Sequence, residues 1–116
     1  MTITRVHGES RGRCRAVAHG GYVYAVATHE SSASTIEEQT ANTLAVLEKN
    51  LSDAGSGKDR ILQATVYLRD MSTKAAMDEV WCEWIGPEEN WPQRACVGAD
   101  LAGKDMIEVV VMAAVL

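Results

Sequence analysis

An arginine and a glutamate near the C-terminal end of the sequence are the residues best suited to chemistry. Arg94 lies within the segment 91–97 (WPQRACV), and Glu108 precedes the most apolar run of the chain, 109–115. The planar fork of arginine binds carboxylates or phosphates through paired hydrogen bonds. A carboxylate beside so apolar a strand needs a reason, because burying an unpaired charge is costly. Two interpretations follow. In one, Arg94 holds a small anion while Glu108 handles a water or a proton; in the other, the two residues form an ion pair that closes neighbouring strands.

Cysteine and histidine supply the remaining candidates for chemistry. Cys96 follows Arg94 by two positions, so both side chains point to the same face of a strand, where Cys96 lines a pocket or packs in the core. A nucleophilic cysteine would need a base such as histidine nearby, and the local sequence offers none. Because His7, His19 and His29 lack metal-ligand spacing, we expect no metal site.

Three further features have structural interpretations. Arg11, Arg13 and Arg15 alternate before a predicted strand, as a solvated strand edge or as extra positive potential at the mouth of an anion site. Cys82 lies among tryptophans in a predicted helix, which indicates packing. We also expect the polar positions 39 and 42 of the first predicted helix, a glutamine and an asparagine, on its outer face.

Length, charge and cysteine content limit the class of protein. The 116 residues, 47% of them hydrophobic, predict one domain over residues 1–116 with a substantial core. A net charge of -5 argues against nucleic acid and anionic membranes as partners. The longest uncharged apolar run, 109–116, is too short to span a bilayer. Three cysteines and no N-terminal signal pattern predict reduced thiols in a cytoplasmic protein.

Hydrophobic periodicity predicts the element order β-β-β-α-β-α-β-β. Gly20-Gly21 joins two apolar runs as in a β-hairpin. The patterns Ser34-x-x-Glu37 and Thr35-x-x-Glu38 both fit a capping box at the start of the first helix, and Gly55 ends that helix. The expected strands cover 3–7, 14–18, 22–28, 61–68, 94–99 and 107–115, and the expected helices cover 35–54 and 73–85.

These elements predict an α+β fold with one mixed sheet and both helices on one face. Strands 61–68 and 109–115 are apolar on both sides, which is typical of doubly buried strands. Two helices cover only one face of a sheet, so another subunit is expected to bury the second face. The pattern therefore predicts a homo-oligomer.

Several motifs taken together resemble the RidA/YjgF family of reactive-intermediate deaminases. The resemblance covers nearly the whole chain, and its motifs occur in the family's order. They are the segments 35–40 (TIEEQT), 54–55 (AG), 64–71 (ATVYLRDM), 77–81 (MDEVW), 92–97 (PQRACV) and 107–109 (IEV).

The resemblance implies a chorismate-mutase-like fold and a homotrimer whose sheets face inward, with sites in the clefts between subunits. By similarity, Arg94 binds the carboxylate of the substrate, Glu108 positions the attacking water, and Cys96 lines the site. Asp78 falls at a further substrate-binding position. The implied reaction hydrolyses 2-imino acids, or their enamine tautomers, to 2-keto acids and ammonia without metal or cofactor.

The chain departs from the family's pattern at three places. Asp78 stands where deaminating members usually carry asparagine, Val26-Ala27 where they carry Ser-Gly, and the segment 11–14 (RGRC) where they carry a tyrosine. These departures keep an alternative open, in which the trimer binds a keto acid or another small carboxylate without chemistry. A ribonuclease or chaperone role is a third hypothesis, and the net charge of -5 counts against RNA.

Overall fold

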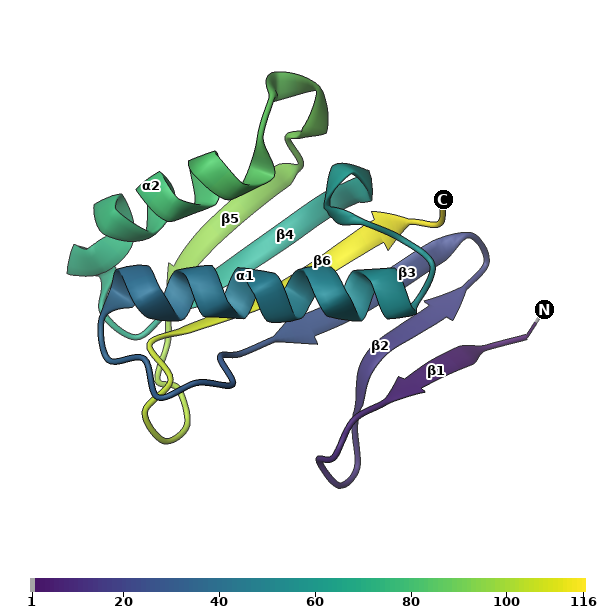
Figure 1. The fold of residues 1–116 in the computed structure, drawn as a ribbon, viewed down its shortest axis with the longest axis horizontal. Helices are drawn as coiled ribbons and strands as arrows, with labels where there is room; N and C mark the ends of the chain where they lie inside the picture. Colours follow the sequence, from purple (N-terminus) through teal and green to yellow (C-terminus); the bar gives the residue numbers. More distant parts are fainter. Residues whose placement is uncertain (1) are drawn as a thin grey trace.

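The computed structural model describes residues 2–116 as a six-stranded mixed sheet with both α-helices on one face (Figure 1). The predicted class and element order are confirmed. The strands are β1 (Thr4–His7), β2 (Cys14–His19), β3 (Tyr22–Ala27), β4 (Ile61–Leu68), β5 (Gln93–Gly98) and β6 (Ile107–Ala114). The helices are α1 (Ile36–Asp53) and α2 (Lys74–Ile85).

The C-terminal strand lies in the middle of the sheet. The strand order is β1-β2-β3-β6-β4-β5, so β6 is inserted between the N-terminal hairpins and the pair β4–β5. Only β4 and β5 run parallel, and α2 lies in the crossover that connects them, as parallel strands require. This order makes β5 an edge strand and separates it from β6 by β4.

Turn and cap residues set the element boundaries where the sequence predicts them. Gly20 and Gly21 have φ angles of 63° and 86°, the positive values that a two-residue type I′ hairpin turn needs. Thr35 caps α1 by accepting a hydrogen bond from the Glu38 amide at 3.2 Å. Gly55 leaves the helix with φ of 88°. Within residues 2–116, neither helix is long and apolar enough to cross a membrane.

The core fills the layer between the helices and the sheet. Leu44, Leu47 and Leu51 of α1 have no exposed surface, and alternate residues of β6 meet them from the sheet. Burying each such leucine contributes about 1.5–3 kcal/mol. The other apolar side chains of the sheet and of α2 that have no exposed surface are Val23, Val66, Leu68, Met77, Ile107, Val109 and Ala113.

Within residues 2–116, no helix covers the other face of the sheet (Figure 1). Tyr22, Tyr24, Val97 and Val110 occupy this open face and are 39–50% exposed. The prediction of an apolar uncovered face is therefore confirmed. Large apolar side chains gathered on one face mark an interaction surface.

Two predicted positions differ from the structure. Gln39 is 1% exposed rather than on the outer face of α1. Its side-chain amide links the loop between β3 and α1 to the loop between β5 and β6. It donates to the carbonyl oxygens of Ala33 at 3.2 Å and Lys104 at 3.0 Å, and it accepts from the Met106 amide at 2.9 Å. Helical periodicity could not show that loops cover this position. Cys82, expected in the core, is exposed because it lies on the outer side of α2.

Replacing Gln39 with alanine is expected to lower the free energy of unfolding by about 2–4 kcal/mol, because buried polar groups of both loops lose their partners. Urea unfolding followed by circular dichroism measures the change. Glu37→Gln, on the exposed side of the same helical turn, is the control and should change stability by less than about 0.5 kcal/mol. Equal stability of Gln39→Ala and wild type would contradict this account.

Candidate functional site

Arg94 and Cys96 lie on the helix-covered side of the sheet, at its edge. In the parallel pairing of β4 and β5, Arg94 is opposite Ala64 and Cys96 is opposite Val66, and both partners are buried beneath the helices. Residues opposite one another in a sheet point to the same face. The predicted common orientation of Arg94 and Cys96 is thus confirmed, and both are half-buried.

Helix α2 surrounds the Arg94 guanidinium with a carboxylate and an aromatic ring. Arg94 Nη2 donates to Asp78 Oδ1 at 2.5 Å, and the guanidinium lies 5.2 Å from the centre of the Trp81 ring. Lys74 Nζ donates to the second oxygen of Asp78 at 2.8 Å. We call Lys74, Asp78, Trp81, Arg94 and Cys96 the Arg94 cluster.

Burial and the neighbouring charges together set the protonation of Asp78 and Cys96. Partial burial alone would raise the pKa of Asp78, but the hydrogen bonds from Lys74 and Arg94 outweigh burial and hold that pKa below its usual value. Burial raises the pKa of the Cys96 thiol, and the neighbouring positive charges offset this only in part. At neutral pH Asp78 is therefore a carboxylate, whereas Cys96 is a thiol unsuited to nucleophilic attack.

Glu108 points to the opposite face of the sheet. Its neighbours in β6, Ile107 and Val109, are fully buried under the helices, so alternation turns Glu108 towards the open face. Strand β4 also separates β5 from β6. The interpretation of Arg94 and Glu108 as a pair that closes neighbouring strands is therefore wrong, and the ion-pair partner of Arg94 is Asp78.

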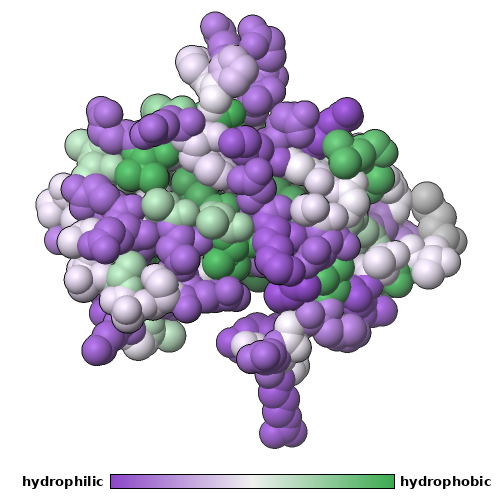
Figure 2. All heavy atoms as spheres, viewed as in Figure 1, coloured by the Kyte–Doolittle hydropathy of each residue, from purple (hydrophilic) through white to green (hydrophobic). Residues whose placement is uncertain are grey.

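A groove of about 1160 Å³ adjoins Glu108 where the β1–β2 hairpin diverges from β3. Strands β2 and β3 pair only as far as Ala16 and Ala25, so the carbonyl of Val26 accepts from Asn50 Nδ2 at 3.0 Å instead. Arg15 holds Asn50 with a hydrogen bond of 2.6 Å. Figure 2 shows the hairpin loop as a hydrophilic projection set off from the body of the protein. The groove residues are His7, Gly8, Glu9, Ser10, Arg13, Cys14, Arg15, Val26, Ala27, Thr28, Glu30, Val46, Lys49, Asn50, Ala102, Asp105 and Glu108.

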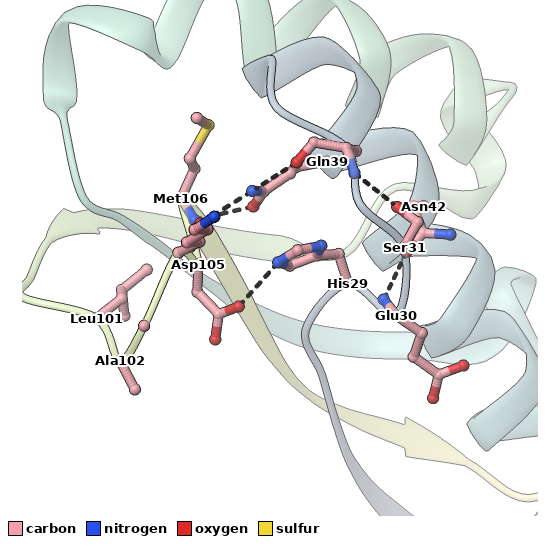
Figure 3. Close-up of polar contacts among 12 residues, drawn as sticks. His29, Glu30, Ser31, Gln39, Asn42, Leu101, Ala102, Asp105 and Met106 are labelled. Atoms are coloured by element: carbon pink, nitrogen blue, oxygen red, sulfur yellow. Dashed lines mark hydrogen bonds and ion pairs between the residues drawn. The ribbon is translucent and has the colours of Figure 1, made fainter.

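Side chains connect the loop between β3 and α1 to the loop between β5 and β6, next to the start of β6 (Figure 3). His29 Nε2 lies 3.0 Å from Asp105 Oδ1, and Gln39 accepts from the Met106 amide. The Met106 carbonyl accepts from the Arg69 amide at 3.0 Å. Both backbone polar groups of Met106 are therefore hydrogen-bonded, two residues before Glu108.

The structure brings three of the four predicted site residues together within one chain. Arg94, Cys96 and Asp78 share the Arg94 cluster, whereas Glu108 lies on the other face. Lys74 was not predicted, although its spacing of four residues from Asp78 on a helix is a signal for an ion pair. Among residues 2–116, no group of three or more His, Cys, Asp or Glu side chains is arranged to hold a metal ion.

The arginines of the β1–β2 hairpin have different surroundings, and Arg15 matches neither predicted interpretation. Arg15 pairs with Asp53 at 3.0 Å, which is a structural role. Arg13 is exposed and is one of the residues that line the groove. Arg11 is exposed outside the groove lining.

The fold and these two sites define an α+β protein with an arginine–aspartate cluster on the helix-covered face of its sheet and a groove of mixed charge that Glu108 lines from the open face. A model of the family described as Endoribonuclease L-PSP matches residues 14–115. The RutC family protein YoaB of Escherichia coli K12 is 37% identical over 116 residues, covering 99% of this chain and 100% of that protein. A RutC family protein of Haemophilus ducreyi is 33% identical over 97% of each.

Solved structures of related proteins support the same family assignment. NMB1025 of Neisseria meningitidis, a member of the YjgF protein family, has a TM-score of 0.93 and 34% identity, covering 100% of this chain and 97% of that one. Rv2704 of Mycobacterium tuberculosis, of the YjgF/YER057c/UK114 family, has a TM-score of 0.86 and 25% identity, covering 98% and 100%. The chain therefore belongs to the Endoribonuclease L-PSP family of RutC and YjgF proteins, and the resemblance to the RidA/YjgF family is confirmed.

The thiol of Cys96 is expected to react with iodoacetamide at pH 8 at least about ten times more slowly than that of exposed Cys82, because its pKa is raised and its side chain is half-buried. Timed alkylation followed by peptide mass spectrometry measures both rates in the same sample. Labelling of Cys96 before Cys82 would show that Cys96 is an activated thiolate.

Acid should weaken the wild type more than an Asp78→Asn variant. The folded protein holds the pKa of Asp78 below the ordinary value of 3.8, so this carboxylate adds stability above that pH. The stability is lost as pH falls through the lower folded pKa. Urea unfolding from pH 6 down to about pH 2 should show the stability difference between wild type and variant shrinking below about pH 4. A difference independent of pH would contradict the assignment.

Proposed function

We propose that the protein hydrolyses 2-imino acids, or their enamine tautomers, to 2-keto acids and ammonia at clefts between the subunits of a homotrimer. The family supports a general role in small-molecule deamination or binding. The observation that carries the finer proposal is that Arg94 and Glu108 lie on opposite faces of the sheet. Each chain would then supply Arg94 to one cleft and Glu108 to another.

The separation of these residues argues for a site made by two chains. A small imino acid cannot reach both faces of one sheet, because the backbone layer and its side chains lie between them. Contact between the Arg94 cluster of one protomer and the Glu108 groove of its partner would join the halves. The exposed apolar side chains of the open face, Tyr24 and Val110 among them, favour such burial by another subunit.

Chemistry at such a cleft needs positioning and proton transfer rather than a strong nucleophile, because the imine carbon is already electrophilic. Arg94 would bind the carboxylate of the substrate. Glu108 would orient a water, accept its proton as the oxygen bonds to carbon, and return the proton to nitrogen. Collapse of the resulting carbinolamine forms the keto group and releases ammonia. Cys96 would line the site as a neutral thiol.

Binding of a keto acid without catalysis is the second candidate. Val26 and Ala27 in the groove wall favour it, since neither side chain offers a hydrogen bond to substrate or water. Binding of 2-oxobutanoate with no acceleration of imine hydrolysis would support this candidate over the deaminase.

The deaminase proposal is tested with 2-iminobutanoate, generated in situ by an amino-acid oxidase from 2-aminobutyrate, while 2-oxobutanoate release is followed. Wild type should accelerate release. Arg94→Ala and Glu108→Gln should each lower kcat/KM by at least about a hundredfold, since each removes a group that acts on substrate or water. Glu83→Gln, exposed on α2, should behave as wild type. Unchanged turnover by Arg94→Ala would reject the proposed clamp.

Mixed oligomers should recover activity that neither single variant has. After Arg94→Ala and Glu108→Gln chains are unfolded and refolded together, about a quarter of the interfaces should combine an intact arginine with an intact glutamate. Activity near a quarter of wild type is expected in the mixture. Separately refolded variants, combined only after assembly, are the control. No recovery in a mixture shown to contain both chains would mean that one chain supplies both groups.

A further inference from the structure

We propose that Asp78 makes the site bind the keto-acid product less tightly than the imino-acid substrate, so that it promotes product release. Lys74 opposes this effect. The inference rests on the proposed deaminase function and deepens it, because it assigns a role in substrate discrimination to two neighbouring residues of α2.

The first argument is the occupancy of the Arg94 donors. Asp78 takes a hydrogen bond from Nη2, Met77 Sδ lies 3.9 Å from Nη1, and the Trp81 ring covers a face of the guanidinium. A ligand carboxylate must use the remaining N–H groups while lying next to the carboxylate of Asp78. Two like charges on one guanidinium repel each other, so Asp78 lowers the affinity of Arg94 for anions.

The second argument is the charge of the two ligands. Two cations, Lys74 and Arg94, and one anion, Asp78, leave the Arg94 cluster with a net charge of +1, and Cys96 adds none as a neutral thiol. A protonated imino acid carries a carboxylate and an iminium, so its net charge is zero. The keto acid is a monoanion. Asp78 therefore repels the anionic product. It repels the substrate much less, because attraction to the iminium offsets repulsion of the carboxylate.

Lys74 provides the opposite perturbation at nearly the same place. It contacts the second oxygen of Asp78 at 2.8 Å, and its side chain is 43% exposed, so its charge can be removed without opening the core. Asp78→Asn raises the charge of the Arg94 cluster by one unit and keeps an oxygen that can accept from Arg94. Lys74→Met lowers the charge by one unit. A charge mechanism predicts opposite effects, whereas loss of local structure predicts weaker binding by both variants.

The test compares binding of 2-oxobutanoate by calorimetry with the KM for 2-iminobutanoate generated in situ. Asp78→Asn should lower the Kd for 2-oxobutanoate about tenfold and Lys74→Met should raise it several-fold, as expected for one charge a few ångströms from an anion. The KM for the imino acid should change by less than about threefold in either variant. Asp78→Asn should also be inhibited more strongly by 2-oxobutanoate. Glu83→Gln, which makes the same charge change on the exposed side of α2, should leave all of these values unchanged.

Three results would overturn the inference. Weaker or unchanged binding of 2-oxobutanoate by Asp78→Asn would show that Asp78 supports Arg94 rather than competing with the ligand. Equal tightening for both ligands would show no discrimination between them. Wild-type binding by Arg94→Ala would reject the clamp of the proposed function and this inference with it. Defective binding by Arg94→Ala together with the first of these results would reject this inference alone.

Discussion

The alternation of side chains along β5 and β6 is the constraint on which the site depends. Because β6 lies at the centre of the sheet, every second residue must pack under the helices, and Glu108 falls between two that do. Arg94 points to the opposite face from Glu108, under the helices, and lies on an edge strand beside α2. Moving Glu108 to the other face would require a one-residue shift that exposes the buried residues of β6. The division of the site into two halves therefore follows from packing.

Packing of α2 then determines what surrounds Arg94. The same helix that buries Met77 and Trp81 brings Asp78 and Lys74 to its exposed margin, one turn apart. The guanidinium is thus held by a carboxylate on one side and an aromatic ring on another. These contacts fix the orientation of the guanidinium, while Asp78 reduces the positive charge that Arg94 offers to an anion.

Local signals were sufficient for the elements but not for the site. Gly20-Gly21, the Thr35 cap and Gly55 act through neighbouring backbone, so the sequence alone located their turns and helix ends. Periodicity also showed that one sheet face lacks a cover. Sequence could not show that β6 inserts between β3 and β4, since strand order depends on contacts far apart in the chain. The opposite orientation of Arg94 and Glu108 was missed for that reason, as was the burial of Gln39 beneath two distant loops.

Asparagine and aspartate at position 78 have nearly the same shape, so the fold does not distinguish between them, but the site does. Either residue can accept a hydrogen bond from Arg94, whereas only aspartate also neutralises it and attracts Lys74. A free anion then binds less tightly than it would beside asparagine. For an enzyme whose substrate loses a positive nitrogen and becomes an anion, weaker anion binding hastens turnover when product release limits the rate. For a protein that only stores or senses a keto acid, the same weakening has no benefit. The charge at position 78 therefore fits the catalytic role better than the binding role.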